Sequence, residues 1–136
     1  MKNLKIKRVC CAIISKEKKV LIAKRADVKY KGLWEFPGGK VNEGESDKEC
    51  LERELVEELD IKTNTGNLFC EVQYDYPDFK IHLLAYHSEI IKGEPKTLEH
   101  LELDWVSILE LNNYEFLKAD LPIVKKLLNH RYIFFF

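Results

Sequence analysis

Three glutamates in one short stretch stand at a spacing that brings carboxylates together. Glu54, Glu57 and Glu58 occupy positions i, i+3 and i+4, so on an α-helix they share one face. Neighbouring carboxylates repel one another unless a cation lies between them. Mg²⁺ prefers oxygen ligands and is commonly shared between carboxylates and substrate phosphates. The spacing therefore predicts a site for Mg²⁺, with Mn²⁺ as the alternative ion. The simpler interpretation is a solvated acidic helix face.

Residues just before these glutamates favour the metal interpretation. Arg53 lies four residues before Glu57, and we expect it to orient that carboxylate through paired hydrogen bonds. Glu45 precedes the helix, where a loop can fold it back as a further ligand or as an orienting group. Gly38 and Gly39 follow a proline and let the backbone approach a ligand closely. The carbonyl of Gly38 is therefore a candidate metal ligand.

The carboxylates need a helix to hold them, and the sequence marks where it begins. Ser46 can cap the first turn, and Glu49 three residues later completes a capping box. Leu51, Leu55 and Leu59 recur every four residues and form one apolar stripe for packing. We therefore expect a helix over residues 46 to about 59.

The remaining elements predict a sheet with helices packed on it. Runs rich in β-branched and other apolar residues predict strands over residues 5–15, 20–23, 68–76, 81–89 and 103–106. The third and fourth of these strands are expected to form a hairpin around Pro77-Asp78. A closing helix is expected over residues 121–130, with Asp120 as its N-cap. This order favours an α+β fold, in which a mixed β-sheet is sandwiched between helices.

Composition bounds the class of protein. The 136 residues suit a single domain over residues 1–136, and 22 basic against 23 acidic residues argue against binding a nucleic-acid polymer by charge. The longest apolar runs, 9–14 and 132–136, fall short of the ~20 residues that span a bilayer. Residues 1–8 carry no signal-peptide pattern. We expect a cytoplasmic monomer or homodimer without membrane contact. The apolar tail 132–136 is expected to cover the domain, join a dimer interface or fray.

Residues 38–61, GGKVNEGESDKECLERELVEELDI, resemble the Nudix box. That motif reads Gly, five residues, Glu, seven residues, Arg-Glu, an apolar residue, any residue, Glu-Glu, any residue, Gly and an apolar residue. The matching positions here are Gly39, Glu45, Arg53, Glu54, Leu55, Glu57, Glu58 and Ile61. Asp60 stands in place of the last glycine. Aspartate tolerates the left-handed conformation that ends such a helix, so the departure bears on local stability and not on metal binding.

The resemblance extends over most of the chain, to the MutT-like branch of the family. Residues 24–25, 33–40, 93–95, 99–100, 105 and 119–122 carry it. It implies a Nudix fold and hydrolysis of a nucleoside diphosphate linked to a further group, which in this branch is usually another phosphate. It also implies that Glu54, Glu57 and Glu58 bind metal, with Glu58 central. Glu99 resembles a late glutamate that helps to bind metal or to activate water; the alternative for it is a surface glutamate.

Four residues are candidates for contacting a nucleotide. Arg25 and Lys40 are the cations best placed to meet phosphate oxygens, the alternative being solvated surface charges. Phe36 can stack on the base or belong to the core. Asp120 matches a late position at which relatives carry Asn or Asp facing the base. A carboxylate accepts a hydrogen bond from an exocyclic amine and, when protonated, donates one to an oxo group.

We therefore expect a Mg²⁺-dependent pyrophosphohydrolase that cleaves a (deoxy)nucleoside 5′-triphosphate to the monophosphate and pyrophosphate. The expected substrate is an oxidised or non-standard nucleotide of the 8-oxo-dGTP type, for nucleotide pool sanitation, or one of the CTP/dCTP type. One alternative is a catalytically silent nucleotide-binding Nudix module, and another is a hydrolase of a different nucleoside diphosphate derivative such as ADP-ribose. If Asp120 does not select the base, the loop 26–32 or the hairpin near Asp78 must.

Overall fold

A mixed β-sheet forms the centre of the molecule. The computed structural model describes residues 5–130. Its strands are β1 (Ile6–Lys16), β2 (Lys19–Lys24), β3 (Trp34–Glu35), β4 (Gly38–Lys40), β5 (Lys62–Asp75), β6 (Lys80–Lys92) and β7 (Glu102–Ser107). The helices are α1 (Asp47–Leu59) and α2 (Leu121–Asn129), with two short 3₁₀ helices at Ile108–Asn113 and Lys118–Asp120.

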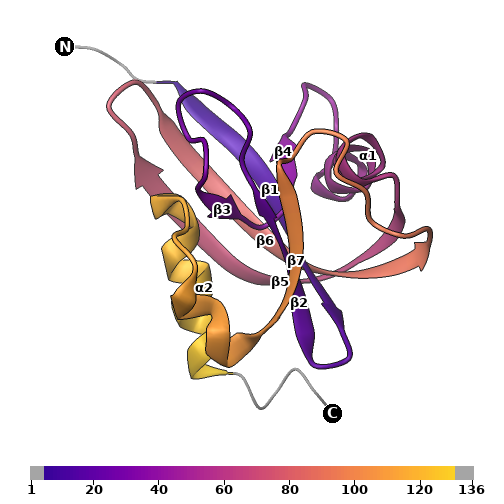
Figure 1. Ribbon diagram of the computed structural model, residues 1–136. Coiled ribbons are helices and arrows are strands. Elements are labelled where there is room, and N and C mark those ends of the chain that lie inside the picture. The colour runs from indigo at the N-terminus through magenta and orange to yellow at the C-terminus, as the bar shows by residue number, and fades with distance from the viewer. Residues whose placement is uncertain (1–4, 131–136) are drawn as a thin grey trace.

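The strands pair in the order β3-β2-β1-β6-β5, with β4 on β1 and β7 on β2. The long strand β1 runs parallel to β6 and antiparallel to β2 and β4, which makes the sheet mixed. In Figure 1, α1 and α2 lie on different sides of this sheet. The predicted α+β architecture, a mixed sheet between helices, is confirmed.

Two hydrophobic cores occupy the two faces of the sheet, and β1 contributes to both. Successive side chains of a strand point to opposite faces. Cys10, Ala12 and Ile14 belong to the core that contains the leucine stripe of α1, whereas Cys11 and Ile13 belong to the core that contains α2. The apolar run of β1 is therefore continuous because both of its faces are buried.

The predicted helix and its caps are confirmed. Ser46 Oγ accepts a hydrogen bond from the Glu49 N–H at 3.1 Å, and the Glu49 carboxylate accepts one from the Ser46 N–H at 3.0 Å. Asp60 ends the helix at φ 56° and ψ 41°, which is the left-handed conformation expected where the Nudix box carries glycine. Buried Leu51, Leu55 and Leu59 hold this helix on the sheet.

The structure departs from the expectation at three places. The hairpin strands β5 and β6 are longer than the apolar runs predicted, and β3 and β4 form where no strand was predicted. The helix α2 is present, but within residues 5–130 the Asp120 side chain makes no capping hydrogen bond to it. Asp120 therefore occupies the predicted N-cap position, but the capping hydrogen bond expected from its side chain is not formed. The tail 132–136 lies outside the described residues.

Within residues 5–130 no helix has both the length and the apolar content needed to cross a membrane.

Candidate active site

The turn before β4 lies against the carboxylates of α1. The N–H of Gly38 donates to Glu58 Oε1 at 3.2 Å. A side chain at Gly39 would collide with the Glu54 carboxylate, and one at Gly38 would collide with the backbone of Cys10 in β1. Only glycine therefore lets the backbone approach these carboxylates so closely. The structure brings Gly38, Glu54 and Glu58 together, as the sequence predicted.

Arg53 ties the glutamates to one another. Its Nε and Nη2 donate to the two oxygens of Glu45 at 2.7 and 2.9 Å. Its Nη1 donates to Glu54 at 2.8 Å and to Glu57 at 3.3 Å. The bidentate pair expected with Glu57 is thus formed with Glu45 instead, because the loop before α1 folds Glu45 back over the arginine. This pairing lowers the pKa of Glu45 to about 2. Both carboxylate oxygens of Glu45 are thus engaged by Arg53.

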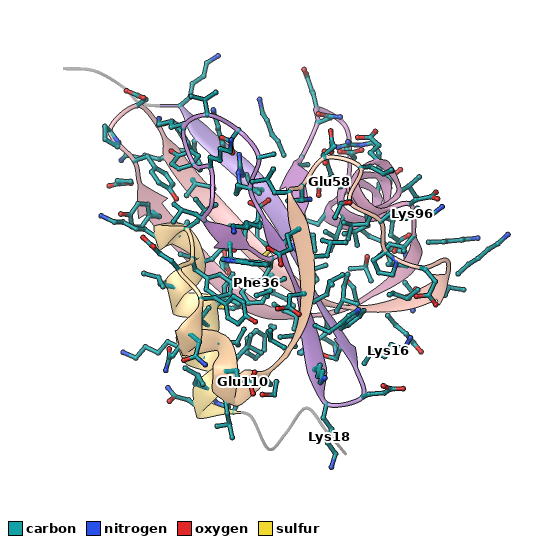
Figure 2. All side chains as sticks on the ribbon, viewed as in Figure 1. Lys16, Lys18, Phe36, Glu58, Lys96 and Glu110 are labelled. Carbon is teal, nitrogen blue, oxygen red and sulfur yellow. The ribbon has the colours of Figure 1, made fainter. Side chains whose placement is uncertain are left out.

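Glu58 lies in a cleft of about 270 Å³ lined by Arg25, Glu35, Gly38, Glu99 and His100, among others. Figure 2 shows Glu58 beside α1, toward the loop that leads into β7. Burial, together with the nearby carboxylates of Glu35, Glu54 and Glu99, raises the pKa of Glu58 to about 9. Burial also raises the pKa of Glu54. The Glu57 side chain is 55% exposed and lies at the outer side of this group.

Glu99 joins the cleft from outside the Nudix box. The loop between β6 and β7 crosses the C-terminal end of α1, where the Lys96 N–H donates to the Leu59 carbonyl at 2.9 Å and the Leu98 N–H to the Glu58 carbonyl at 3.3 Å. The negative charge of Glu99 acts on both Glu54 and Glu58. The structure therefore brings the late glutamate to the box carboxylates, although Glu99 follows Glu58 by 41 positions in the sequence.

Across residues 5–130, no three carboxylate, histidine or cysteine side chains converge on one point as metal ligands would. Hydrogen bonds from Arg53 and from the Gly38 N–H occupy the carboxylates instead. Of the candidate metal ligands, Gly38, Glu58 and Glu99 line one cleft. All of the candidates offer oxygen atoms, which are the ligands that Mg²⁺ and Mn²⁺ take.

A second cleft, of about 410 Å³, adjoins the first and shares Arg25, Glu35 and Gly38 with it. Lys40 lines this second cleft. The Arg25 guanidinium donates to Asp27 at 2.8 Å and to Glu35 at 2.9 Å, so it stands fixed at the junction of the two clefts.

Aromatic rings form the wall of the second cleft. Tyr30, Tyr76 and Phe79 line it, and the Tyr76 ring lies 5.2 Å from that of Phe79 and 6.1 Å from that of Tyr30. The sequence pattern did not single out these rings. The sequence feature that could have revealed them is the pair Tyr76 and Phe79 on either side of the Pro77-Asp78 turn. This turn belongs to the hairpin that was expected to select the base if Asp120 does not.

Asp120 lies at the inner end of this cleft and is buried. Its Oδ2 accepts a hydrogen bond from the Phe36 N–H at 2.9 Å. Burial, with a smaller contribution from the charge of Glu35, raises the pKa of Asp120 to about 8. The carboxyl group therefore holds a proton over much of the neutral range.

Phe36 belongs to the core. Its side chain is 2% exposed and its ring stacks on Phe116 with the centroids 5.4 Å apart. Figure 2 places it in the interior of the molecule. Of the two roles open for Phe36, the structure supports packing. The residue also lines the second cleft, where its backbone N–H donates to Asp120.

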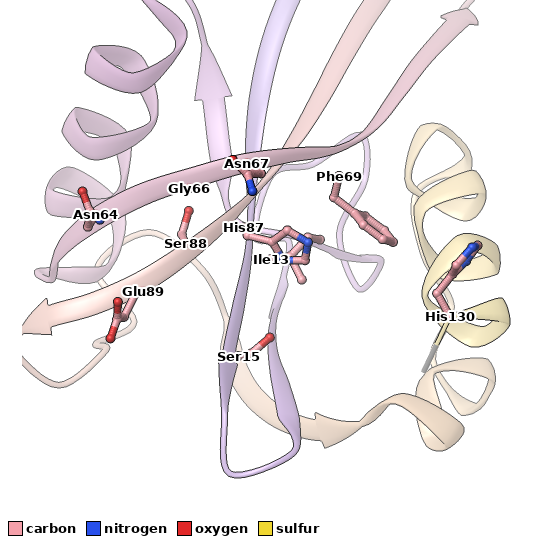
Figure 3. A pocket seen from close by; sticks show the side chains of 10 residues that line it. All are labelled: Ile13, Ser15, Asn64, Gly66, Asn67, Phe69, His87, Ser88, Glu89 and His130. Carbon is pink, nitrogen blue, oxygen red and sulfur yellow. The ribbon is translucent and has the colours of Figure 1, made fainter. Parts of the chain in front are cut away.

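A larger cavity of about 600 Å³ lies elsewhere, between β1, β5, β6 and the end of α2. Figure 3 shows Phe69 of β5 pointing toward the helix that carries His130. Among the described residues that line this cavity, Glu89 is the one carboxylate, and none also lines the two clefts above. Size therefore does not identify the candidate active site here, whereas the presence of Arg25, Glu35, Glu58 and Glu99 in one cleft does.

Comparison with known proteins agrees with this geometry. A family model described as a NUDIX domain matches residues 9–126, and the chain belongs to the Nudix family. It is 38% identical over 123 residues to a CTP pyrophosphohydrolase of Escherichia coli (strain K12), covering 90% of this chain and 91% of that one. It is 36% identical over 129 residues to the 8-oxo-dGTP diphosphatase of the same organism, covering 93% and 98%.

A solved structure supports the same assignment. The solution structure of the E. coli ORF135 protein matches with a TM-score of 0.84 and 35% identity, covering 96% of this chain and 94% of that chain. The resemblance to the Nudix family and to its MutT-like branch, inferred from residues 38–61 and their surroundings, is confirmed.

Proposed function

We propose that this chain, as one Nudix domain over residues 1–136, is a pyrophosphohydrolase that cleaves a (deoxy)nucleoside 5′-triphosphate to the monophosphate and pyrophosphate. The observation that carries the proposal is the junction of two clefts at Arg25, Glu35 and Gly38. One cleft is lined by glutamates and the other by aromatic rings with Asp120 at its inner end. A nucleotide laid across the junction places its phosphates in the first cleft and its base in the second.

We propose that Mg²⁺, or Mn²⁺ in its place, is the cofactor. The donors that fit it are the carboxylates of Glu54, Glu57, Glu58 and Glu99 and the Gly38 carbonyl, an all-oxygen set. The crowding of Glu54, Glu58 and Glu99 supports this assignment, since such a group of carboxylates is stabilised by a cation. When bound, the ion neutralises phosphate charge and lowers the pKa of an attacking water molecule.

The side chains of the protein supply positioning. Arg53 fixes Glu54 from one side and Glu45 fixes Arg53 in turn, so the carboxylate is held before substrate arrives. Arg25, at the junction of the two clefts, and Lys40, which lines the second cleft, are the cations proposed to meet phosphate oxygens. Phosphoryl transfer of this kind depends mainly on positioning and electrostatics, and no residue needs to form a covalent intermediate.

Asp120 reads the base in this proposal. A protonated carboxyl group donates its O–H to a carbonyl oxygen, while its other oxygen accepts from an N–H. Both 8-oxoguanine and cytosine carry a carbonyl oxygen and an N–H donor. The rings of Tyr76 and Phe79 provide a face for stacking. The proposed substrates are therefore 8-oxo-dGTP and CTP or dCTP, which agrees with the names of the two E. coli relatives.

A nucleotide panel tests the proposal. The protein is assayed with 8-oxo-dGTP, dGTP, CTP, dCTP and ADP-ribose, with and without Mg²⁺, and pyrophosphate and phosphate are measured separately. We expect pyrophosphate from 8-oxo-dGTP or from the cytosine nucleotides, and none without metal. Glu89→Gln changes a glutamate of the large cavity, away from the two clefts, and should leave turnover unchanged. It is the control for substitutions of the glutamates in the first cleft. Turnover of ADP-ribose alone, or of no nucleotide, would contradict the proposal.

We further propose that the protein acts in the cytoplasm, as a monomer or homodimer, on free nucleotides and not on a nucleic-acid polymer. The balance of 22 basic and 23 acidic residues supports the last point, because it argues against binding a nucleic-acid polymer by charge.

A further inference from the structure

His100 makes a buried contact that the proposed mechanism does not yet use. Its side chain is 5% exposed, and its Nε2 lies 2.8 Å from Glu35 Oε2. A carboxylate oxygen accepts, so Nε2 is the donor. The other oxygen of Glu35 accepts from Arg25 Nη1 at 2.9 Å. Glu35 is thus held from two sides, and it joins the end of β2, the strand β3 and the loop that carries His100.

That loop is attached to the rest of the protein on either side of Glu99. The Leu98 N–H donates to the Glu58 carbonyl at 3.3 Å, and the Leu101 N–H donates to the Lys24 carbonyl at 2.9 Å. Between these two attachments, the side chain of His100 provides the contact that draws the loop toward Glu35. Glu99 is the residue next to it, and both side chains line the cleft with Glu58.

The imidazole at this position is not explained by packing. Its Nδ1 is buried and has no hydrogen-bond partner among residues 5–130. A buried polar atom without a partner lowers stability, and an apolar side chain of similar size would avoid that cost. The hydrogen bond of Nε2 to Glu35 is therefore the feature that distinguishes histidine from a residue that merely fills the space.

We propose that His100 is a positioning residue: its hydrogen bond to Glu35 holds the loop 98–101 so that Glu99 faces Glu58 across the cleft. The proposal rests on the proposed function in one respect, that Glu99 takes part in the reaction. Glu35 is the fixed point of this arrangement, because Arg25 and His100 engage both of its carboxylate oxygens.

Hydrogen exchange of the metal-free protein tests the structural half of the proposal without any nucleotide. His100→Phe keeps a ring of similar size and removes the donor, whereas His100→Gln keeps an N–H donor. We expect the amides of residues 98–101 to exchange at least tenfold faster in His100→Phe and to recover in His100→Gln, while the amides of α1 stay unchanged. Equal exchange in the parent and in His100→Phe would overturn the proposal.

Kinetics test the functional half. In His100→Phe we expect kcat to fall about tenfold with KM for the nucleotide unchanged, and His100→Gln to regain most of the loss. His82→Phe is the matched control, because His82 also pairs with a glutamate, Glu71, but on β6 away from the cleft. It should leave kcat unchanged.

A double variant shows whether His100 acts through Glu99. In a Glu99→Gln background, His100→Phe should lower kcat by less than twofold further. Independent, multiplicative losses would overturn the proposal. Failure of the proposed function has a different signature: the parent would then turn over ADP-ribose alone or no nucleotide in the panel, whatever the exchange data show.

Discussion

The Asp120 carboxylate and the backbone N–H of Phe36, 84 positions apart in the sequence, are joined by a buried hydrogen bond of 2.9 Å. This bond fixes the inner end of the aromatic cleft to the segment that leads into the Pro37-Gly38-Gly39 turn. The same turn contacts Glu54 and Glu58 of α1. The base and phosphate ends of the proposed nucleotide site are thus built on one short segment.

Asp120→Asn should change which base is preferred. The amide keeps an oxygen for the Phe36 N–H but offers an NH₂ group where the carboxyl group offers O–H or O⁻. A single base contact is worth ~1–3 kcal/mol, so ratios of kcat/KM between 8-oxo-dGTP and dCTP should move about tenfold or more. Metal dependence should stay unchanged. An unchanged ranking across the nucleotide panel would show that Asp120 does not select the base, so that the loop 26–32 or the hairpin near Asp78 must.

The stability of the protein should depend on pH through Asp120. Burial raises the pKa of Asp120 from its ordinary value of 3.8 to about 8, so the folded state binds this proton more tightly than the unfolded chain does. Raising the pH from about 4 to 8 therefore weakens the folded state, and the loss is complete above pH 8. Asp120→Asn removes this pH-dependent contribution to the free energy of unfolding.

Urea unfolding of the parent and of Asp120→Asn at pH 5 and pH 8.5 measures the pH-dependent contribution of Asp120 to stability. The free energy of unfolding of Asp120→Asn relative to the parent should increase between the two pH values, by more than the ~1.4 kcal/mol that one pKa unit represents. A difference that is the same at both pH values would mean that Asp120 titrates normally and is hydrated in the folded state.

Asp60→Gly should be neutral for catalysis and nearly neutral for stability. Asp60 is in the left-handed conformation, so glycine relieves strain of roughly 1 kcal/mol. Against this stand the extra backbone entropy of glycine, roughly 0.5–1 kcal/mol, and the loss of an exposed ion pair with Lys96 at 3.1 Å. Thermal unfolding of Asp60→Gly beside Lys96→Ala separates the two contributions. A large loss of Tm in the first variant alone would contradict this balance.

Local signals predicted α1 well, because its cap, its leucine stripe and its left-handed end are all set by residues within a few positions of one another. The strands β3 and β4 escaped prediction because two or three residues carry no periodicity. They form through pairing with distant partners, Glu35 with Ala23 and Gly39 with Cys10.

In the candidate site, too, local sequence predicts some features and tertiary folding determines the others. Helical spacing alone is enough to place Glu54 and Glu58 on one face. The partner of Arg53 could not be predicted from helical spacing, since a loop carries Glu45 back to it. The bond of Asp120 to Phe36 and that of His100 to Glu35 depend on tertiary folding, so neither has a signal in the local sequence.

Glu58→Gln tests the central claim most directly, through kcat and stability measured on the same variant. The amide keeps an acceptor for the Gly38 N–H, and it removes a buried carboxylate whose pKa is raised to about 9 by burial and by Glu35, Glu54 and Glu99. The metal-free variant should therefore unfold at the same temperature as the parent or higher. Its kcat at saturating Mg²⁺ should fall by about 100-fold or more, the range seen when an electrostatic stabiliser is lost. Parent-like turnover at saturating Mg²⁺ in a folded Glu58→Gln protein would contradict the account.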